Sequence, residues 1–154
     1  MKIANHTSRR LKNSGFSLAE VAITSFLIIF FTALSADLAL LIFACSVNDK
    51  ACRDVVRACA QQTNAADSAA FAAAETKNHK TDGVFISPIR LVAVTYQDFA
   101  GTPPAGKTPY VQATTSVNVT LPLPLLFFGL SFTNNMSFSQ TYTSPIIKTK
   151  YVLN

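Results

Sequence analysis

The chain has few charged residues, and its first fifteen residues contain no acid at all. Only 14% of the 154 residues are charged, while 49% are hydrophobic. The net charge of +5 lies mostly in the leading segment, where Lys2, Arg9, Arg10 and Lys12 contribute +4; the nine other Lys and Arg nearly balance eight Asp and Glu. A protein that tracks phosphates is expected to cluster Lys and Arg on its folded part. The charge distribution therefore argues against a nucleic-acid partner.

The sequence also lacks a catalytic constellation. His6 lies in the leading segment, which leaves His79 at a predicted helix end, where we expect exposure to solvent. No carboxylate pair, Cys-His pair or zinc-ligand spacing accompanies it. The segment 101–108, GTPPAGKT, matches a phosphate-binding pattern, but two prolines remove donors and Pro109 follows before a strand-like stretch. We predict a loop there, and no enzymatic activity, cofactor or metal; a nucleotide hydrolase is a remote alternative.

Cysteines are few and odd in number, which excludes a closed disulfide framework within one chain. Cys45, Cys52 and Cys59 are spaced seven residues apart and share one stripe of a helix. Neighbours at that spacing are about 10.5 Å apart along the axis, too far for a disulfide. Burial at a helix–helix seam is the leading interpretation, and disulfides between chains are the alternative.

A long apolar run dominates the first third of the chain. It extends from Val21 to Val47, and Asp37 is its single charge. At about 1.5 Å per residue the run spans about 40 Å, more than the ~30 Å hydrocarbon core of a bilayer. A removable signal peptide has a core of only about 7–15 residues. The run therefore predicts a membrane helix, and the preceding basic residues place the N-terminus in the cytoplasm.

The position of Asp37 sets the expected depth of this helix. Asp37 follows Phe16 by 21 residues, about 32 Å along a helix, so we expect it to reach the outer headgroups at little cost. Pairing inside the membrane is the alternative. Residues 38–47 stay apolar beyond that point, and such a surface requires a partner.

The remainder predicts a helix and then a sheet. Residues 48–77 are rich in Ala and contain no Gly or Pro, so we expect the helix to continue until the turn at 81–83. Alternating β-branched and aromatic residues then predict three strands, at Ile89–Phe99, Tyr110–Leu121 and Ser137–Ile147. Residues 125–132 form an apolar connector or a short edge strand.

These elements predict an α+β fold, in which a long N-terminal helix carries a small antiparallel sheet on its outer half. The expected segments are a leader (1–15), a membrane and assembly helix (16–47), its extracytoplasmic continuation (48–80) and a β domain (81–154). Two glycosylation sequons, at Asn118-Val-Thr120 and Asn135-Met-Ser137, are short enough to occur by chance.

One motif joins the basic leader to the apolar helix: Gly15-Phe16-Ser17-Leu18-Ala19-Glu20. It resembles the class III signal of type IV prepilins and pseudopilins. The resemblance implies cleavage by a membrane aspartyl peptidase between Gly15 and Phe16, with the helix kept in the mature protein. It also implies that Glu20 pairs with the new N-terminal amine of a neighbouring subunit, because a carboxylate inside a bilayer is costly without a partner. A simple anchor that carries Gly and Glu by chance is the alternative.

A narrower resemblance is to the TadE-like pseudopilins of tight-adherence (Tad) pili. It rests on Gly15 to Glu20, the polar break at Asp37, the Ala- and Arg-rich segment 51–61 and a β-rich tail. It implies a minor pilin in the bacterial inner membrane, with a cytoplasmic N-terminus and an extracytoplasmic C-terminal domain. The implied partners are other pilin subunits, prepilin peptidase, the assembly platform and membrane lipid. A type II secretion pseudopilin and a single-span anchor that presents an extracellular binding domain are the alternatives.

Overall fold

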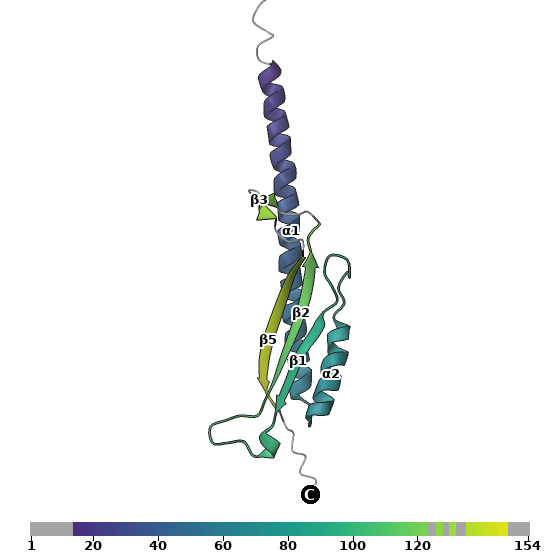
Figure 1. Ribbon diagram of the computed structural model, residues 1–154, viewed down its shortest axis with the longest axis vertical. Helices are drawn as coiled ribbons and strands as arrows, with labels where there is room; N and C mark the ends of the chain where they lie inside the picture. The colour runs from purple at the N-terminus through teal and green to yellow at the C-terminus, as the bar shows by residue number, and fades with distance from the viewer. Residues whose placement is uncertain (1–13, 123–125, 128–129, 132–134, 148–154) are drawn as a thin grey trace, which may run out of the picture. The chain divides into compact units, whose positions relative to one another are not determined.

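The protein has an α+β fold, seen in a computed structural model that describes residues 14–122, 126–127, 130–131 and 135–147 (Figure 1). A long N-terminal helix, α1 (Ser14–Ala60), is followed by helix α2 (Ala65–Asn78) and a three-stranded antiparallel sheet. The described chain divides into two bodies, and the boundary falls inside α1, between Ala36 and Asp37. The predicted fold class is confirmed.

Helix α1 contains no proline, and its single glycine, Gly15, lies in the first turn. It ends at Ala60 because other groups bind the carbonyl oxygens of its last turn. The backbone N–H of Gln62 donates to the carbonyl of Cys59 at 3.1 Å, and the N–H of Ile147 donates to the carbonyl of Ala60 at 3.0 Å. The side chain of Gln62 donates to the carbonyl of Ala58 at 3.0 Å. These bonds satisfy acceptors that a helix end leaves open.

A separate second helix corrects the prediction of one continuous helix to residue 77. Helix α2 begins after Asn64, whose side-chain oxygen accepts the backbone N–H of Asp67 at 2.8 Å. The amide nitrogen of Asn64 also donates to the carboxylate of Asp67 at 2.7 Å. This N-cap fixes a new helix start despite the high helix propensity of the surrounding alanines.

The sheet has the order β1-β2-β5, with β1 at Arg90–Gln97, β2 at Tyr110–Thr120 and β5 at Asn135–Pro145. All three predicted strands are confirmed, with ends shifted by at most two residues. Strands β2 and β5 pair without interruption over eleven residues, whereas β1 has an irregularity between Leu91 and Ala93.

Three short elements complete the described chain. A 3-10 turn, η1 (Phe99–Gly101), follows β1. Strands β3 (Leu126–Phe127) and β4 (Leu130–Ser131) form a separate two-stranded pair within the predicted connector. The connector is therefore strand-like where it is described, and its other residues lie outside the described ones.

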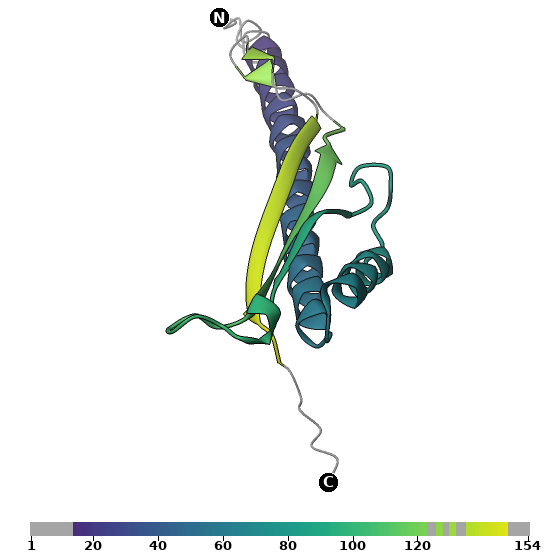
Figure 2. The ribbon, with the colours of Figure 1, turned by 60° about the horizontal axis from the view of Figure 1, so that its bottom comes forward.

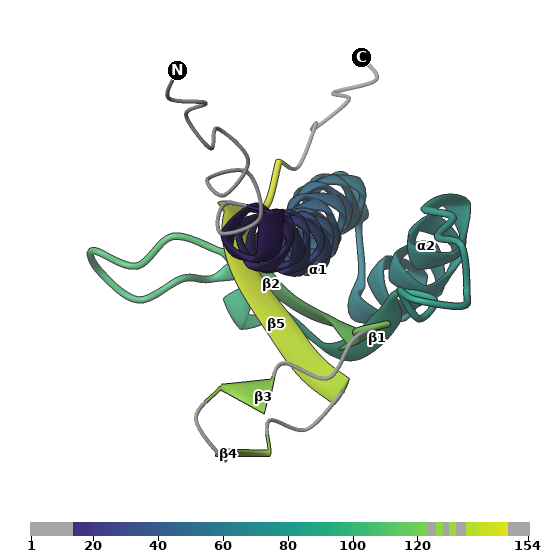
Figure 3. The ribbon, with the colours of Figure 1, turned by 90° about the horizontal axis from the view of Figure 1, so that it is seen from above.

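Within the body that begins at Asp37, one face of the sheet packs on residues 37–60 of α1, and α2 lies beside β1 (Figures 2 and 3). Alternate residues of β2 face the helix and are buried: Val111, Ala113, Thr115, Val117 and Val119. Two apolar clusters result, one around Val55 and Cys59 and one around Ala44 and Ile86. Because the side-chain period of a strand is two, the opposite face of the sheet is left to solvent.

Candidate functional site

The expected cleavage position, between Gly15 and Phe16, lies in the first turn of α1. Residues 1–13, which hold the basic leader, lie outside the described residues. The backbone at Gly15 and Phe16 is already helical, so the expected peptidase site is at the very start of the helix that the cleaved protein would retain.

Glu20 lies one turn further along α1 and is exposed. It makes no hydrogen bond or ion pair with any part of the chain that the structure describes. The neighbours of Glu20 on its own helix are uncharged, so any partner for its charge has to come from outside the described residues.

The large apolar side chains of residues 18–31, the segment that contains Glu20, are all exposed. They are Leu18, Val21, Ile23, Phe26, Leu27, Ile28, Ile29, Phe30 and Phe31. Two hydroxyl groups in the same segment are satisfied within the helix: Thr32 donates to the carbonyl of Ile28 at 2.8 Å and Ser35 to that of Phe31 at 2.7 Å. This back-bonding is the way in which hydroxyls are accommodated where water is absent.

The described part of α1 is long and apolar enough to cross a membrane, judged by length and composition. The candidate segment is Ser17–Ala60, with a mean hydropathy of 2.5 in its most apolar window, and 6% of that window is buried within the protein. A buried core helix would pass the same test, but this window is almost wholly uncovered.

Asp37 is buried, and this corrects the expectation that its carboxylate costs little. Its side chain is 1% exposed, and neither carboxylate oxygen has a hydrogen-bond partner among the described residues. Asp37 begins the stripe of α1 that faces the sheet, ahead of Leu41, Ala44 and Asn48. A buried carboxylate without a partner is costly, because burial removes water and nothing replaces its hydrogen bonds.

The opposite side of α1 stays apolar beyond Asp37, as the sequence predicts. Leu38, Ile42 and Phe43 are 56%, 62% and 58% exposed. This part of the helix therefore has two apolar faces, of which its own sheet covers only one. The uncovered face continues the composition of residues 17–36 and forms a surface suited to packing against other apolar groups.

The three cysteines have different environments, and all are free thiols. Cys52 is buried against the sheet, where its thiol donates to the carbonyls of Gln140 at 3.2 Å and Ala113 at 3.4 Å. Cys59 is buried at the seam between α1 and α2, where its thiol donates to the carbonyl of Ser68 at 3.3 Å. Cys45 is partly exposed. The prediction of burial at a helix–helix seam therefore holds for Cys59, whereas Cys52 is buried at a contact between helix and sheet.

Small and polar residues of α1 bind the outer edge of β5. The side chain of Asn48 donates to the carbonyl of Phe138 at 3.3 Å and accepts the hydroxyl of Thr115 at 2.8 Å. One turn further, Arg53 donates to the hydroxyl of Tyr142 at 3.0 Å, and that hydroxyl donates to Asp49. The bond from Asn48 covers a carbonyl group that this edge strand would otherwise leave open, and the contacts of Tyr142 are between side chains.

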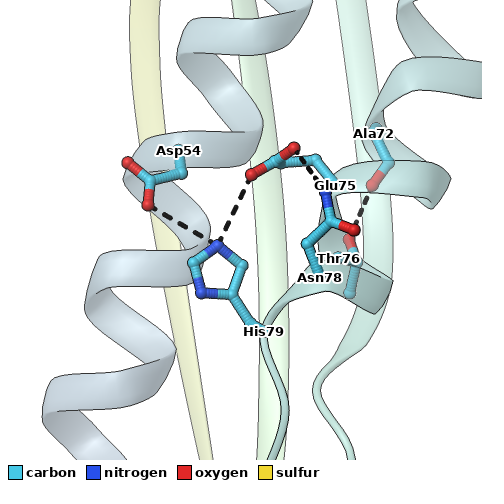
Figure 4. Close-up of polar contacts among 6 residues, drawn as sticks. All are labelled: Asp54, Ala72, Glu75, Thr76, Asn78 and His79. Carbon is cyan, nitrogen blue, oxygen red and sulfur yellow. Dashed lines mark hydrogen bonds and ion pairs between the residues drawn. The ribbon is translucent and has the colours of Figure 1, made fainter.

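His79 is not exposed at a free helix end, which corrects a second expectation. Its side chain is 14% exposed, and Nε2 lies 3.5 Å from Asp54 of α1 and 3.7 Å from Glu75 of α2 (Figure 4). Asn78 donates to the other oxygen of Glu75 at 3.0 Å and holds that carboxylate in place. Within the described chain no group of His, Cys, Asp and Glu side chains is suited to a metal ion, so this cluster joins two helices.

The phosphate-binding pattern at 101–108 lies in an exposed loop that projects past the end of the sheet, between β1 and β2 (Figure 2). No helix begins at Lys107; the backbone turns at 105–106 and enters β2 at Tyr110. The predicted loop is confirmed. It lacks the helix N-terminus on which a phosphate-binding loop depends.

A scan against protein-family models, a search of curated proteins and a search of solved structures each returned no match to this chain.

Proposed function

We propose that this protein is a minor pilin or pseudopilin of a Tad-type, type IV-related pilus. In this proposal prepilin peptidase cleaves it between Gly15 and Phe16, and the mature chain is held in the inner membrane by α1. The protein has a structural role and catalyses no reaction. The C-terminal body lies on the extracytoplasmic side, since the basic leader stays in the cytoplasm.

The observation that carries the proposal is the difference in side-chain exposure between the two parts of α1. The large apolar side chains of residues 18–31 are all exposed, and residues 37–60 are covered on one side only. A bilayer accounts for the first segment. The uncovered apolar side chains of Leu38, Ile42 and Phe43 lie beyond Asp37, and they favour a helix that packs against other helices in an assembly.

Glu20 supplies the second support. It is exposed, lacks a partner in the described chain and follows the expected cleavage point by five residues. Cleavage would create an α-amino group at Phe16, and such a group in a neighbouring subunit would neutralise the Glu20 carboxylate in a low-dielectric setting. The partners in this proposal are other pilin subunits, prepilin peptidase, the inner-membrane assembly platform and lipid.

The direct test is N-terminal sequencing of the protein after co-expression with a prepilin peptidase. We expect a mature start at Phe16. Gly15→Val should block cleavage, because the extra side chain would enter the peptidase cleft, whereas Ser14→Ala serves as the matched control and should be cleaved normally. An intact Met1 would favour the single-span anchor, and a cut near Ala36 by ordinary signal peptidase would overturn the proposal.

A second test separates cleavage from assembly. Glu20→Ala should be cleaved like the wild type but should fail to enter filaments, while Glu20→Asp, which keeps the charge, should restore part of the incorporation. The readout is the amount of the subunit in sheared surface filaments relative to the membrane fraction. Normal incorporation of Glu20→Ala would remove the charge-pairing role.

A further inference from the structure

A hollow of about 390 Å³ lies at one end of the solvent-facing side of the sheet, where β2 ends and β5 begins. The backbone that precedes β1 forms one wall, with Val84 and Ser87. The other walls carry polar side chains of the two strands, which belong to Asn118, Thr120, Asn135 and Ser137. All of these residues belong to the body that begins at Asp37.

The walls are held in place by hydrogen bonds between the backbone before β1 and the end of β2. Ser87 N–H donates to the carbonyl of Asn118 at 2.8 Å, and Asn118 N–H donates to the hydroxyl of Ser87 at 2.9 Å. Thr120 N–H donates to the carbonyl of Phe85 at 2.7 Å. A site whose backbone is already fixed loses little freedom when a ligand binds.

The chemistry of the walls is polar but uncharged. The described lining offers two amides and three hydroxyls, and Val84, which is 72% exposed, adds apolar surface. Thr120 donates to the side-chain oxygen of Asn135 at 2.7 Å, which leaves the amide nitrogen of Asn135 to donate elsewhere.

This lining narrows the class of ligand. The described walls contain no Lys or Arg for an anion and no carboxylate for a cation. A wholly apolar ligand would leave the amides of Asn118 and Asn135 unpaired, which is costly. A ring that carries several hydroxyl groups and an apolar CH face matches both parts of the lining, and this is the chemistry of a neutral sugar.

The same chemistry continues along the solvent-facing side of β2 and β5. Beyond the hollow this side carries, in cross-strand pairs, Ser116 with Ser139, Thr114 with Thr141 and Gln112 with Thr143. The last two pairs are hydrogen-bonded at 2.9 and 3.2 Å, which fixes their side chains. Residues on one face of a strand repeat at about 6.8 Å, and the pairing of β2 with β5 is regular throughout. The result is a row of hydroxyl and amide groups that leads away from the hollow, and Arg90 of β1, the cross-strand partner of Ser116, is its charged neighbour.

We propose that this face binds a neutral polysaccharide, with one sugar unit in the hollow and the following units along the row of paired side chains. The inference rests on the sheet alone and does not depend on the proposed role in a pilus.

The test is binding of the full-length protein, in detergent micelles, to four immobilised neutral polysaccharides: dextran, laminarin, mannan and agarose. Heparin and polyglutamate serve as charged comparisons. The test variant combines Asn118→Ala with Ser137→Ala, two exposed positions outside the apolar core. Thr102→Ala, in the exposed loop before β2, is the matched control. Circular dichroism melts establish that both variants keep the fold.

We expect the wild type to bind at least one neutral polysaccharide, and the double variant to bind that polymer about tenfold more weakly, as expected for two lost hydrogen bonds. Thr102→Ala should bind like the wild type. The proposal is overturned if none of the four polymers is bound, if only the charged polymers are bound, or if a folded double variant binds as well as the wild type.

Discussion

The two parts of α1 reverse the usual relation between side-chain size and burial. Residues 18–31 carry large Phe, Ile, Leu and Val side chains, and these are exposed; Ile28, for example, is 62% exposed. In residues 37–60 the buried positions are mostly small, such as Ala44, Ala51 and Cys52, each 0% exposed. Small side chains let the helix approach β5 closely enough for Asn48 and Cys52 to bind its carbonyl oxygens. Large exposed apolar side chains therefore mark the first part, while small buried side chains mark the part that the protein covers itself.

An aspartate introduced into each part should give the largest difference between them. Val55→Asp places a charge at a position that is 0% exposed, and we expect it to destabilise the C-terminal body by more than about 4 kcal/mol. Ile28→Asp should leave that stability within about 0.5 kcal/mol and should instead make membrane insertion less favourable by about 3 kcal/mol. Denaturant unfolding in micelles, followed by near-UV circular dichroism, and membrane fractionation measure the two effects. Equal destabilisation by both changes would contradict the division.

Asn48 offers a smaller and more specific test of the covered part. Asn48→Ala leaves the carbonyl of Phe138 and the hydroxyl of Thr115 without their partner in the core, and we expect a loss of about 2–3 kcal/mol. Ser46→Ala, an exposed position on the same helix, should change the stability by less than about 0.5 kcal/mol. The measurement is again denaturant unfolding, and equal effects of the two variants would show that the contact to β5 contributes little.

Asp37, at the boundary between the two parts, should respond in the opposite direction. Because its buried carboxylate has no partner in the described chain, Asp37→Leu is expected to raise the stability of the body by about 2 kcal/mol. The contrasting variant is Asp49→Leu, which loses contacts to Arg53 and Tyr142 and should lower stability. A thermal melt of each variant in micelles shows whether the change raises or lowers stability. Destabilisation by Asp37→Leu would reveal a partner for that carboxylate.

Within the covered part, the reactivity of the three cysteines tests which side of α1 is buried. Cys45 is partly exposed, so it should react with a maleimide first in the folded protein. Cys52 and Cys59 should react at least about tenfold more slowly, because each must wait for the body to open. Mass spectrometry of a labelling time course measures the order. Rapid labelling of Cys52 would mean that α1 is not held against the sheet.

The smallest effect is expected from pH at the turn before β1. Hydrogen bonds from the backbone, chiefly from Ile86, hold the pKa of Asp82 below its usual value. Since the folded pKa is lowered, the contribution of Asp82 to stability is present above its unfolded pKa of about 3.9 and is lost as pH falls through the folded pKa. Asp82→Ala should therefore destabilise the protein slightly at pH 7, and the difference from wild type should shrink toward pH 3 in urea unfolding. A difference that does not change with pH would assign the effect to the turn geometry alone.

Periodicity and composition predicted the strands and the apolar helix, because those signals are local. The alternation in β2 follows from a sheet with one wet face, and the run from Val21 to Val47 follows from the cost of exposing apolar groups to water. The break before α2 was missed although Asn64 and Asp67 have the spacing of a helix cap. Alanine propensity is a weak preference, and a cap together with tertiary hydrogen bonds at Ala60 outweighs it.

The environments of the site residues were harder to foresee. Nothing in the sequence near Asp37 shows that its side of the helix is covered by the protein. For His79, the spacing of four residues from Glu75 was a usable signal, but Asp54 is 25 residues away and only the packing of α2 against α1 brings it near.

The sequence by itself determined one long apolar helix, with Gly15 and Glu20 near its start, and a small antiparallel sheet. Those features depend on residue type and on spacing along one element. Only the tertiary structure decided which side of α1 is covered, that Cys52 and Cys59 are buried, and that hydroxyl and amide groups of β2 and β5 form one continuous face. These properties depend on the register between strands and on helix rotation, which contacts between residues distant in sequence determine.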